Sequence, residues 1–241
     1  MSQYKTDRFQ QGLEEFGISL NQEQIDHFLS YYEQLIEWNQ VMNLTTITEF
    51  EDVIVKHFLD SLSIVKVMDM TQDLTLIDVG TGAGFPGIPL KIAFPNLKIT
   101  LLDSLQKRVK FLTKIIQTLK LEDINAIHGR AEDYAKENEY REQYDVCVSR
   151  AVANLTTLSE YCLPFVKTGG NFISYKSEKI KEEAIHAEHG IKKLGGYIEN
   201  QVELILPDTD IYRNLLVIHK EKNTPAQYPR QAGIPAKEPL S

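Results

Sequence analysis

The spacing of apolar residues predicts a helix early in the chain. Across residues 21–40 apolar side chains return every three or four positions, as they do on one face of an α-helix. Asn21 and Gln24 stand at the spacing of a capping box, in which each side chain bonds the backbone N–H of the other residue. We therefore expect the helix to begin near Asn21.

A second helical pattern covers residues 48–68. Its apolar positions again follow the helical period, and Thr48 and Glu51 repeat the spacing of a capping box. Together the two patterns predict that residues 1–72 form a helical cap, folded onto the next part of the chain.

The pattern then changes to short apolar runs that alternate with helical segments. Five strand–helix units of this kind predict a parallel, doubly wound sheet. The connection between the last two apolar runs is too short for a parallel crossover, so these runs should form an antiparallel hairpin. The expected strands are residues 74–79, 97–103, 124–129, 144–149, 169–177, 197–207 and 212–220, and the expected helices are residues 86–93, 105–119, 178–194, a short one near Glu132 and one through Leu158.

These elements assign the chain to the α/β class, with a mostly parallel seven-stranded sheet, a terminal antiparallel hairpin and an N-terminal helical extension. The domain that contains the sheet should cover residues 73–222. Residues 223–241 contain four prolines and a slight excess of basic side chains. We expect this tail to pack near the site that receives the substrate.

Composition adds limits on location and partners. The chain is 42% hydrophobic and 25% charged, as soluble proteins are, and no run approaches the roughly 18 apolar residues of a membrane span. Residues 1–78 carry 4 basic and 14 acidic side chains, whereas residues 79–241 carry 22 basic and 20 acidic. The net charge of −8 argues against indiscriminate coating of nucleic acid.

The two cysteines and the polar first residues bear on the compartment. Cys147 falls in an apolar strand and Cys162 in a helix, so both are expected to be buried, reduced thiols. The start "MSQYKTDRFQ" does not have the pattern of a secretory signal. We expect a cytoplasmic protein that does not bind membranes.

Candidate chemistry centres on the stretch "LIDVGTGAGFPGIPLK", where an apolar strand ends on Asp78 and opens into a glycine-rich loop. Its glycines are Gly80, Gly82, Gly84 and Gly87. Glycines let the backbone turn tightly and approach a ligand, and the following helix presents its N-terminus to an anion. A phosphate-binding P-loop is excluded because no Gly-Lys-Ser/Thr follows. A dinucleotide and S-adenosylmethionine remain as ligands.

Two acidic residues and the reversed strand bear on this choice. Asp103, at the end of the second strand, can accept hydrogen bonds from a ribose diol of either ligand. Asp78 would repel a pyrophosphate but suits the ammonium and sulfonium of S-adenosylmethionine, whose carboxylate the loop amides can take. The antiparallel final strand is also typical of methyltransferases. The features together favour a methyltransferase over a dinucleotide-dependent oxidoreductase.

The acceptor is narrowed by what the sequence lacks. After the fourth strand, "YDVCVSRAVANL" has no Asn/Asp-Pro-Pro-Tyr/Phe pattern, which is associated with methylation of exocyclic amines. Neither cysteine suits attack on a pyrimidine carbon, because both read as buried. An acceptor that is already nucleophilic, such as a ring nitrogen, remains. A methyltransferase for a protein or small molecule, an oxidoreductase and a non-catalytic nucleotide-binding module stay open as alternatives.

Several motifs together resemble those of the GidB/RsmG family, bacterial 16S ribosomal RNA guanine-N7 methyltransferases. They are "LIDVGTGAGFPGIPLKIAFP", "LLDSLQKRVKFL", "HGRAED", "SRAVANL" and "YPRQAGIPAKEPL", and the similarity begins at "WNQVMNLT" and includes "KHFLDSL". The resemblance implies a Rossmann-like class I methyltransferase fold and S-adenosyl-L-methionine as cofactor. It also implies that 16S rRNA, free or within the small ribosomal subunit, is methylated at N7 of a guanine near the decoding site.

Carried over by position, the resemblance implies cofactor contacts at Gly80, Phe85, Asp103, Ala131, Glu132 and Arg150. Ala131 would offer its backbone N–H to the adenine edge, and Glu132 would accept from the adenine amino group, with an exposed helix cap as its alternative role. For Arg150 the alternative is a structural salt bridge.

Weaker candidates lie elsewhere. For contacts with RNA we expect Lys176, Arg213, Arg230 and Lys237. His57, Asn39 and Asn43 lie in motifs that resemble the family's, and their alternatives are roles in helix packing or capping. His186 and His189 belong to a charged helix face, and we expect no metal site. We also expect no catalytic base, and we favour a monomer.

Overall fold

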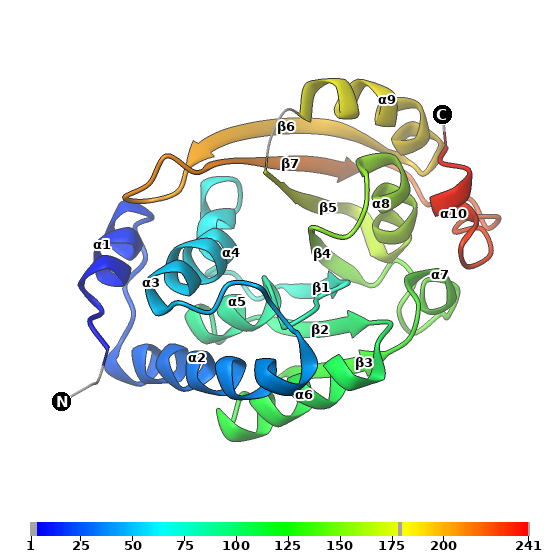
Figure 1. Ribbon diagram of the computed structural model, residues 1–241. Helices are drawn as coiled ribbons and strands as arrows, with labels where there is room; N and C mark the ends of the chain where they lie inside the picture. The colour runs from blue at the N-terminus through cyan, green and yellow to red at the C-terminus, as the bar shows by residue number, and fades with distance from the viewer. Residues whose placement is uncertain (1–3, 178–179, 241) are drawn as a thin grey trace.

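The computed structural model describes residues 4–177 and 180–240. Its strands are β1 Thr75–Val79, β2 Lys98–Asp103, β3 Ile124–His128, β4 Tyr144–Arg150, β5 Val166–Lys176, β6 Gly196–Ile205 and β7 Tyr212–Lys220. They form one sheet in the order β3-β2-β1-β4-β5-β7-β6 (Figure 1). β1 to β5 are parallel, and β7 lies antiparallel between β5 and β6. The predicted α/β sheet with its terminal hairpin is confirmed.

Alternate side chains of the strands enter two cores, one on each face of the sheet. Leu76 belongs to the core that the N-terminal helices share, whereas its neighbour Ile77 packs with the later helices. On the first face lie α1 Asp7–Glu15, α2 Gln22–Met42, α3 Phe50–Val53, α4 Asp60–Leu62, α5 Gly87–Ala93 and α6 Gln106–Thr118; on the second lie α7 Ala131–Tyr134, α8 Leu155–Cys162 and α9 Ile180–Lys193. The first two residues of the predicted helix 178–194 lie outside the described residues.

Asparagine residues cap both ends of helix α2. Asn21 Oδ1 accepts from the N–H of Gln24, and Gln24 Oε1 accepts from the N–H of Asn21, each at 2.9 Å. At the far end Asn43 is left-handed (φ 50°) and donates its N–H to the carbonyl of Asn39. Asn39 Oδ1 in turn accepts from the N–H of Thr45 at 2.8 Å. The predicted capping box is confirmed, and Asn39 and Asn43 cap the helix end.

The second predicted helix is divided, and its predicted capping box is wrong. α3 begins after Glu49, whose side chain makes no capping hydrogen bond, so Thr48 and Glu51 do not cap it. The chain continues as a π-helix at Ile54–Leu59, as α4, and as a 3₁₀-helix at Ser63–Lys66. A π-turn holds one more residue than an α-turn and so changes the direction of the side chains that follow. Apolar periodicity does not reveal it.

The N-terminal helices share a core with the sheet. Phe28 on α2 and Leu76 on β1 belong to the same cluster of buried residues. Tyr31, also on α2, donates a hydrogen bond to the carbonyl of Ala83 in the glycine loop. The helical cap therefore folds onto the sheet, as predicted, while the domain boundary at residue 72 stays a prediction. None of the helices in the described part of the chain is long and apolar enough to cross a membrane.

The C-terminal tail packs on the second face of the sheet. Arg141 donates to the carbonyls of Thr224 and Tyr228 at 2.7 and 2.9 Å, and Thr157 on α8 donates to the carbonyl of Pro235 at 3.1 Å. The tail contains a short helix, α10 Ile234–Lys237, which lies beside α7 and α8 and far from α1 (Figure 1). The predicted packing of the tail near an acceptor site stays a prediction.

Candidate active site

The glycines of the loop between β1 and α5 serve different purposes. Gly80 has φ +72°, and a Cβ there would meet Val152 Cγ2 at 2.6 Å. Gly82, at φ +65°, faces open space, with the nearest atom 4.0 Å away. Gly84, at φ +99°, lies under the hydroxyl of Tyr31, 2.8 Å from where a Cβ would be. Gly82 therefore keeps the open side of the loop free, whereas Gly80 admits the side chain of Val152 and Gly84 admits α2.

Two buried carboxylates hold this loop from the inside. Asp78 Oδ2 accepts from the hydroxyl of Thr81 at 2.6 Å and from the N–H of Gly87 at 2.9 Å. Asp103 Oδ2 accepts from the N–H of Gly82 at 2.9 Å. The protein itself thus uses loop amides that we expected to bind a ligand carboxylate. The two acids shape the loop before any ligand enters.

Asp78 lies beneath the loop rather than in a cavity. It is fully buried, and its Oδ1 has no hydrogen-bond partner among the described residues. Burial raises the pKa of Asp78 from 3.8 to about 6. A direct contact between Asp78 and a cofactor stays a prediction.

A cavity of about 220 Å³ opens at the carboxyl ends of the first four strands. The order of strands reverses between β1 and β4, and open α/β sheets bind ligands at such switch points. The lining of this cavity, which we call the Gly80 cavity, includes Gly80, Ala131 and Glu132. The structure thus brings together three of the predicted cofactor residues, one from the loop after β1 and two from the start of α7.

The Gly80 cavity fits an adenosine. Val79, Leu102 and Val152 supply apolar walls for a purine ring, and Glu132 supplies a carboxylate that is 4% exposed. Glu132 Oε1 accepts from the N–H of Gly233 in the tail at 2.9 Å, which fixes the carboxylate. Glu132 is therefore not the exposed helix cap that was its alternative.

Asp103 lies between two residues that line the same cavity. It is 2% exposed, and its neighbours Leu102 and Ser104 both line the cavity. Its Oδ1 accepts from the N–H of Leu105 at 2.8 Å, and Arg108 Nη1 lies 3.3 Å from its Oδ2. A carboxylate offers about four lone-pair sites, and Gly82, Leu105 and Arg108 use three of them, so capacity for a ribose hydroxyl remains. The ribose contact itself stays a prediction.

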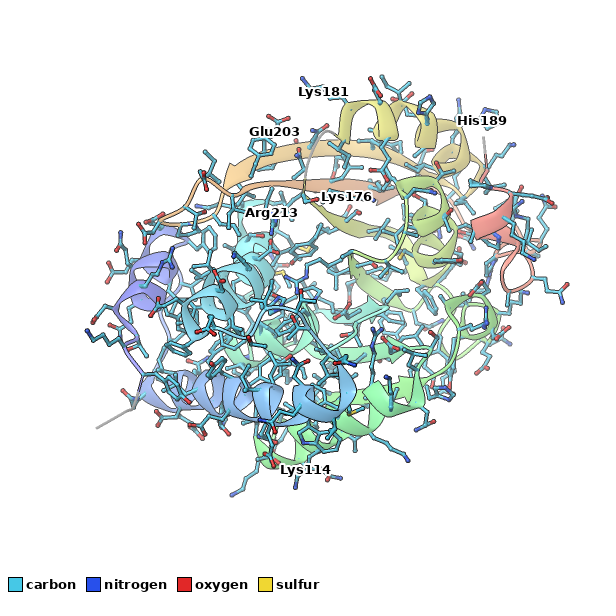
Figure 2. The ribbon with its side chains drawn as sticks, in the orientation of Figure 1. Lys114, Lys176, Lys181, His189, Glu203 and Arg213 are labelled. Atoms are coloured by element: carbon cyan, nitrogen blue, oxygen red, sulfur yellow. The ribbon has the colours of Figure 1, made fainter. Side chains whose placement is uncertain are left out.

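A second cavity, of about 470 Å³, lies at the carboxyl ends of β4 and β5, and we call it the Arg213 cavity. Arg150 and Ala151 border it, whereas Val152 borders the Gly80 cavity, so one short segment separates the two. Ala151 is left-handed, with φ 57°. Lys176 from β5 and Arg213 from β7 also line the Arg213 cavity, and Figure 2 shows both on the inner side of the hairpin.

Arg150 is fixed by the helical cap. Its Nη1 donates to Asp60 Oδ2 at 2.9 Å and to the carbonyl of Lys56 at 3.1 Å. Its Nη2 lies 3.2 Å from Nδ1 of His57, and its guanidinium carbon lies 5.1 Å from the centre of the Phe85 ring. Arg150 therefore makes the salt bridge that was its alternative role, and it also borders the Arg213 cavity. Its cofactor contact stays a prediction.

His57 is held as a neutral imidazole. Its ring stacks on Phe85, with centroids 4.4 Å apart and planes at 16°, and its Nε2 lies 2.9 Å from the hydroxyl of Thr45. Burial, helped by the charge of Arg150, lowers the pKa of His57 from 6.5 to about 3. Both ring nitrogens have partners, so His57 is poorly placed to act as a general base.

Similarity to known proteins decides the family. A family model described as rRNA small subunit methyltransferase G, GidB, matches residues 24–209. The chain belongs to the GidB family. A protein of Lachnoclostridium phytofermentans named ribosomal RNA small subunit methyltransferase G is 54% identical over 232 residues, which are 96% of each chain. One of the same name from Alkaliphilus metalliredigens is 54% identical over 95% of this chain and 96% of its own length.

Solved structures agree with the GidB assignment at the level of the fold. A SAM-dependent methyltransferase from Aquifex aeolicus superposes with a TM-score of 0.54 at 17% identity, over 73% of this chain and 96% of its own. TYW2 of P. horikoshii, in complex with MeSAdo, gives a TM-score of 0.52 at 18% identity, over 66% of this chain and 60% of its own. The predicted Rossmann-like methyltransferase fold is confirmed, and family membership confirms the predicted methyltransferase class with S-adenosylmethionine as cofactor.

The predicted RNA contacts of this GidB protein lie in different places. Lys176 and Arg213 line one cavity, although Lys176 also pairs with Glu183 at 2.8 Å. Arg230 forms a salt bridge with the fully buried Glu160, in which Arg230 Nη2 lies 2.6 Å from Glu160 Oε2. This pair anchors the tail. Lys237 is exposed on α10. Only the first two come together; for all four, contact with RNA stays a prediction.

The cysteines of the GidB protein are buried, as predicted. Cys147 and Cys162 are free and 0% exposed, and burial raises the pKa of the Cys147 thiol well above its usual value. A buried neutral thiol is a weak nucleophile. Within residues 4–177 and 180–240, His, Cys, Asp and Glu side chains form no cluster of three that could hold a metal ion.

Sequence reasoning missed several residues of both cavities. Asp60 lies in the quoted motif "KHFLDSL" yet was not singled out, and Val152 and Tyr161 line the Gly80 cavity. A signal for Asp60 was present, because a carboxylate among Phe58, Leu59 and Leu62 is unlike the usual exposed acid of a helix. No comparable signal marks Val152.

Proposed function

We propose that this protein transfers a methyl group from S-adenosylmethionine to N7 of a guanine in 16S rRNA, near the decoding site. The observation that carries the proposal is membership of the GidB family along nearly the whole chain, at 54% identity to a ribosomal RNA small subunit methyltransferase G. The two adjoining cavities support it, because a group transfer needs a donor site and an acceptor site in contact.

The Gly80 cavity is the proposed adenosyl site. Gly80 lets Val152 form a wall of this cavity. In the proposal Ala131 and Glu132 contact the adenine, and Asp103 contacts the ribose. When bound, S-adenosylmethionine supplies an electrophilic methyl group on a sulfonium. The Phe85 ring, under Arg150 and His57, lies toward the neighbouring cavity, where the methyl group would leave.

The Arg213 cavity is the proposed acceptor site. Lys56, Arg150, Lys176 and Arg213 line it with four cationic side chains against the carboxylates of Asp60 and Glu183. A cationic wall in a protein of net charge −8 suits the phosphates of a nucleotide. Guanine N7 carries a lone pair and no proton, so the transfer needs placement rather than a general base.

Other properties belong to the same proposal. We expect a monomer acting in the cytoplasm, on 16S rRNA either free or within the small ribosomal subunit.

The test is a methyl-transfer assay with tritium-labelled S-adenosylmethionine and three acceptors: small ribosomal subunits lacking the modification, naked 16S rRNA, and cytosolic protein. We expect label in the RNA, and strand cleavage by borohydride and aniline at one guanine, because that treatment cuts at N7-methylguanine. Label in protein alone, or in RNA that resists this cleavage, would contradict the proposal. Tight binding of NAD instead of S-adenosylmethionine in calorimetry would favour the oxidoreductase alternative.

A further inference from the structure

The carboxylate of Asp60 lies between two arginines from distant parts of the chain. Its Oδ2 accepts from Arg150 Nη1 at 2.9 Å, and its Oδ1 accepts from Arg213 Nε at 3.0 Å. The Asp60 side chain is 3% exposed, whereas those of Arg150 and Arg213 are 14% and 18% exposed. The acid is therefore almost fully buried where it borders the cavity, and the two cations beside it are more exposed than it is.

Each arginine has a second tie that fixes the plane of its guanidinium. Arg213 Nη1 donates to the carbonyl of Tyr212 at 2.9 Å, and Arg150 Nη1 donates to the carbonyl of Lys56 at 3.1 Å. A guanidinium has five N–H donors in a rigid fork. Arg213 has two donors engaged, and Arg150 has two on Nη1 and its Nη2 beside His57 Nδ1, so the direction of the remaining donors is fixed as well.

Charge explains why a carboxylate is needed at this point. Two guanidiniums that share one partner would repel each other without it, and Asp60 offsets that repulsion from the protein side. The π-helical turn Ile54–Leu59 directly precedes Asp60 and sets the direction in which it leaves the helix. The helical cap thus supplies an acid to a surface on which cations come from β4 and β7.

We propose that Asp60 is a positioning residue, which orients Arg150 and Arg213 so that they present their remaining donors to one phosphate of the acceptor strand in the Arg213 cavity. The inference rests on the proposed function, since it names how that site holds its substrate. Asp60 acts through the arginines and does not itself touch the RNA.

The test compares four variants with the wild type: Asp60→Asn, Arg213→Gln, Arg213→Lys and the double variant Asp60→Asn/Arg213→Gln. For each, kcat and KM for 16S rRNA are measured in the methyl-transfer assay, and circular dichroism melting reports folding. Asp145→Asn is the matched control, because Asp145 also pairs with a cation, Lys167, and with Thr75, at the amino end of β4 and away from the cavity.

We expect Asp60→Asn to raise the KM for RNA at least about tenfold with a smaller change in kcat, as loss of a substrate contact does. Arg213→Gln should raise the KM for RNA to a similar extent. The double variant should have a KM only slightly above that of either single variant, because Asp60 and Arg213 act together on the same contact. Asp145→Asn should lower the melting temperature without changing this KM. Additive effects on KM in the double variant would contradict the proposal.

Arg213→Lys keeps the inference testable if Asp60→Asn fails to fold. Lysine keeps the charge but has no fork, so we expect a KM close to that of Arg213→Gln. A KM equal to that of the wild type would show that a fixed direction is not needed and would overturn the inference. If the wild type methylates no RNA at all, the proposed function fails instead, so the two failures are distinguishable.

Discussion

The two cavities at the carboxyl edge of the sheet are assembled in opposite ways. The Gly80 cavity is made by short segments that directly follow β1, β2, β3 and β4, as in any sheet of this topology. The Arg213 cavity gathers residues that the fold alone does not bring together, such as Asp60 and Arg213, which are 153 positions apart. The first follows from the order of strands, and the second depends on the helical cap and the terminal hairpin.

This difference suggests how donor and acceptor recognition are separated. A change in the hairpin alters the Arg213 cavity and leaves the glycine loop in place. The helical cap contacts both, because Tyr31 on α2 bonds the carbonyl of Ala83 in the loop. Arg150 is the exception, since it borders one cavity while the next two residues lead to the other. Variants that disturb one cavity at a time therefore test the division.

Arg150→Ala should have the largest effect on stability and activity, because Arg150 lies in the segment that separates the two cavities. The change removes one partner of the buried Asp60 carboxylate, and breaking a buried ion pair costs about 3 kcal/mol or more in the free energy of unfolding. Methyl transfer should fall with it. Chemical denaturation measures the first effect. Arg8→Ala, which removes a partly exposed pair with Asp208, is the control and should cost at most about 1 kcal/mol. Equal losses in both variants would argue against a special role for Arg150.

Asp103→Ala should affect the Gly80 cavity alone. Loss of hydrogen bonds to a charged group should weaken binding of S-adenosylhomocysteine by about 1.5–3 kcal/mol, and the loop loses the bond to Gly82 as well. Calorimetry gives the dissociation constant, and the KM for RNA at saturating cofactor should change little. A dissociation constant like that of the wild type would remove Asp103 from the cofactor site.

Gly80→Ala, compared with Gly17→Ala, should give a smaller but more selective effect. Both glycines are left-handed, at φ +72° and +69°, so both variants carry similar backbone strain of about 1 kcal/mol. Only at Gly80 would the new Cβ reach a neighbour, Val152 at 2.6 Å, and the cavity. We expect weaker cofactor binding in Gly80→Ala and normal binding in Gly17→Ala. Similar binding by both variants would mean that the loop does not face the ligand.

The smallest effect on rate should come from pH. His57 stays neutral above its pKa of about 3, and guanine N7 needs no base, so the single-turnover rate should be nearly constant from about pH 6.5 to 8.5. The free energy of unfolding should depend on pH below that range. The unfolded chain protonates His57 below pH 6.5, whereas the folded protein does not protonate it until its pKa of about 3. As the pH falls between these two values, His57 therefore lowers the free energy of unfolding by about 1.4 kcal/mol per pH unit. His57→Gln should therefore lose stability less steeply between about pH 6 and 4.5. A rate that falls on the acidic side near neutrality would indicate a catalytic base.

The difference between the Gly80 cavity and the Arg213 cavity also explains what could be predicted from the sequence. The glycine loop, Asp103, Ala131 and Glu132 lie next to strand ends, so strand periodicity and the motifs were enough to bring them together. Their detailed roles were harder to foresee. That Asp78 and Asp103 already bond the amides of Gly87 and Gly82 depends on the shape of the folded loop.

The Arg213 cavity shows where prediction from the sequence ended. Arg213 and Lys176 were candidates because cations near strand ends suit phosphates. The partner of Arg213 is Asp60, which follows a π-helical turn that apolar spacing does not reveal. Arg230 was a candidate as a basic residue of the tail, yet it pairs with the buried Glu160. A basic residue in a sequence does not show whether its charge faces solvent or a buried acid.

A crystal structure of the protein with S-adenosylhomocysteine tests the central claim most directly, because the claim is that donor and acceptor have separate cavities. We predict that the adenosine lies among Gly80, Ala131 and Glu132 and that the Arg213 cavity stays open for the RNA. An adenosine bound instead between Arg150 and Arg213 would contradict the account.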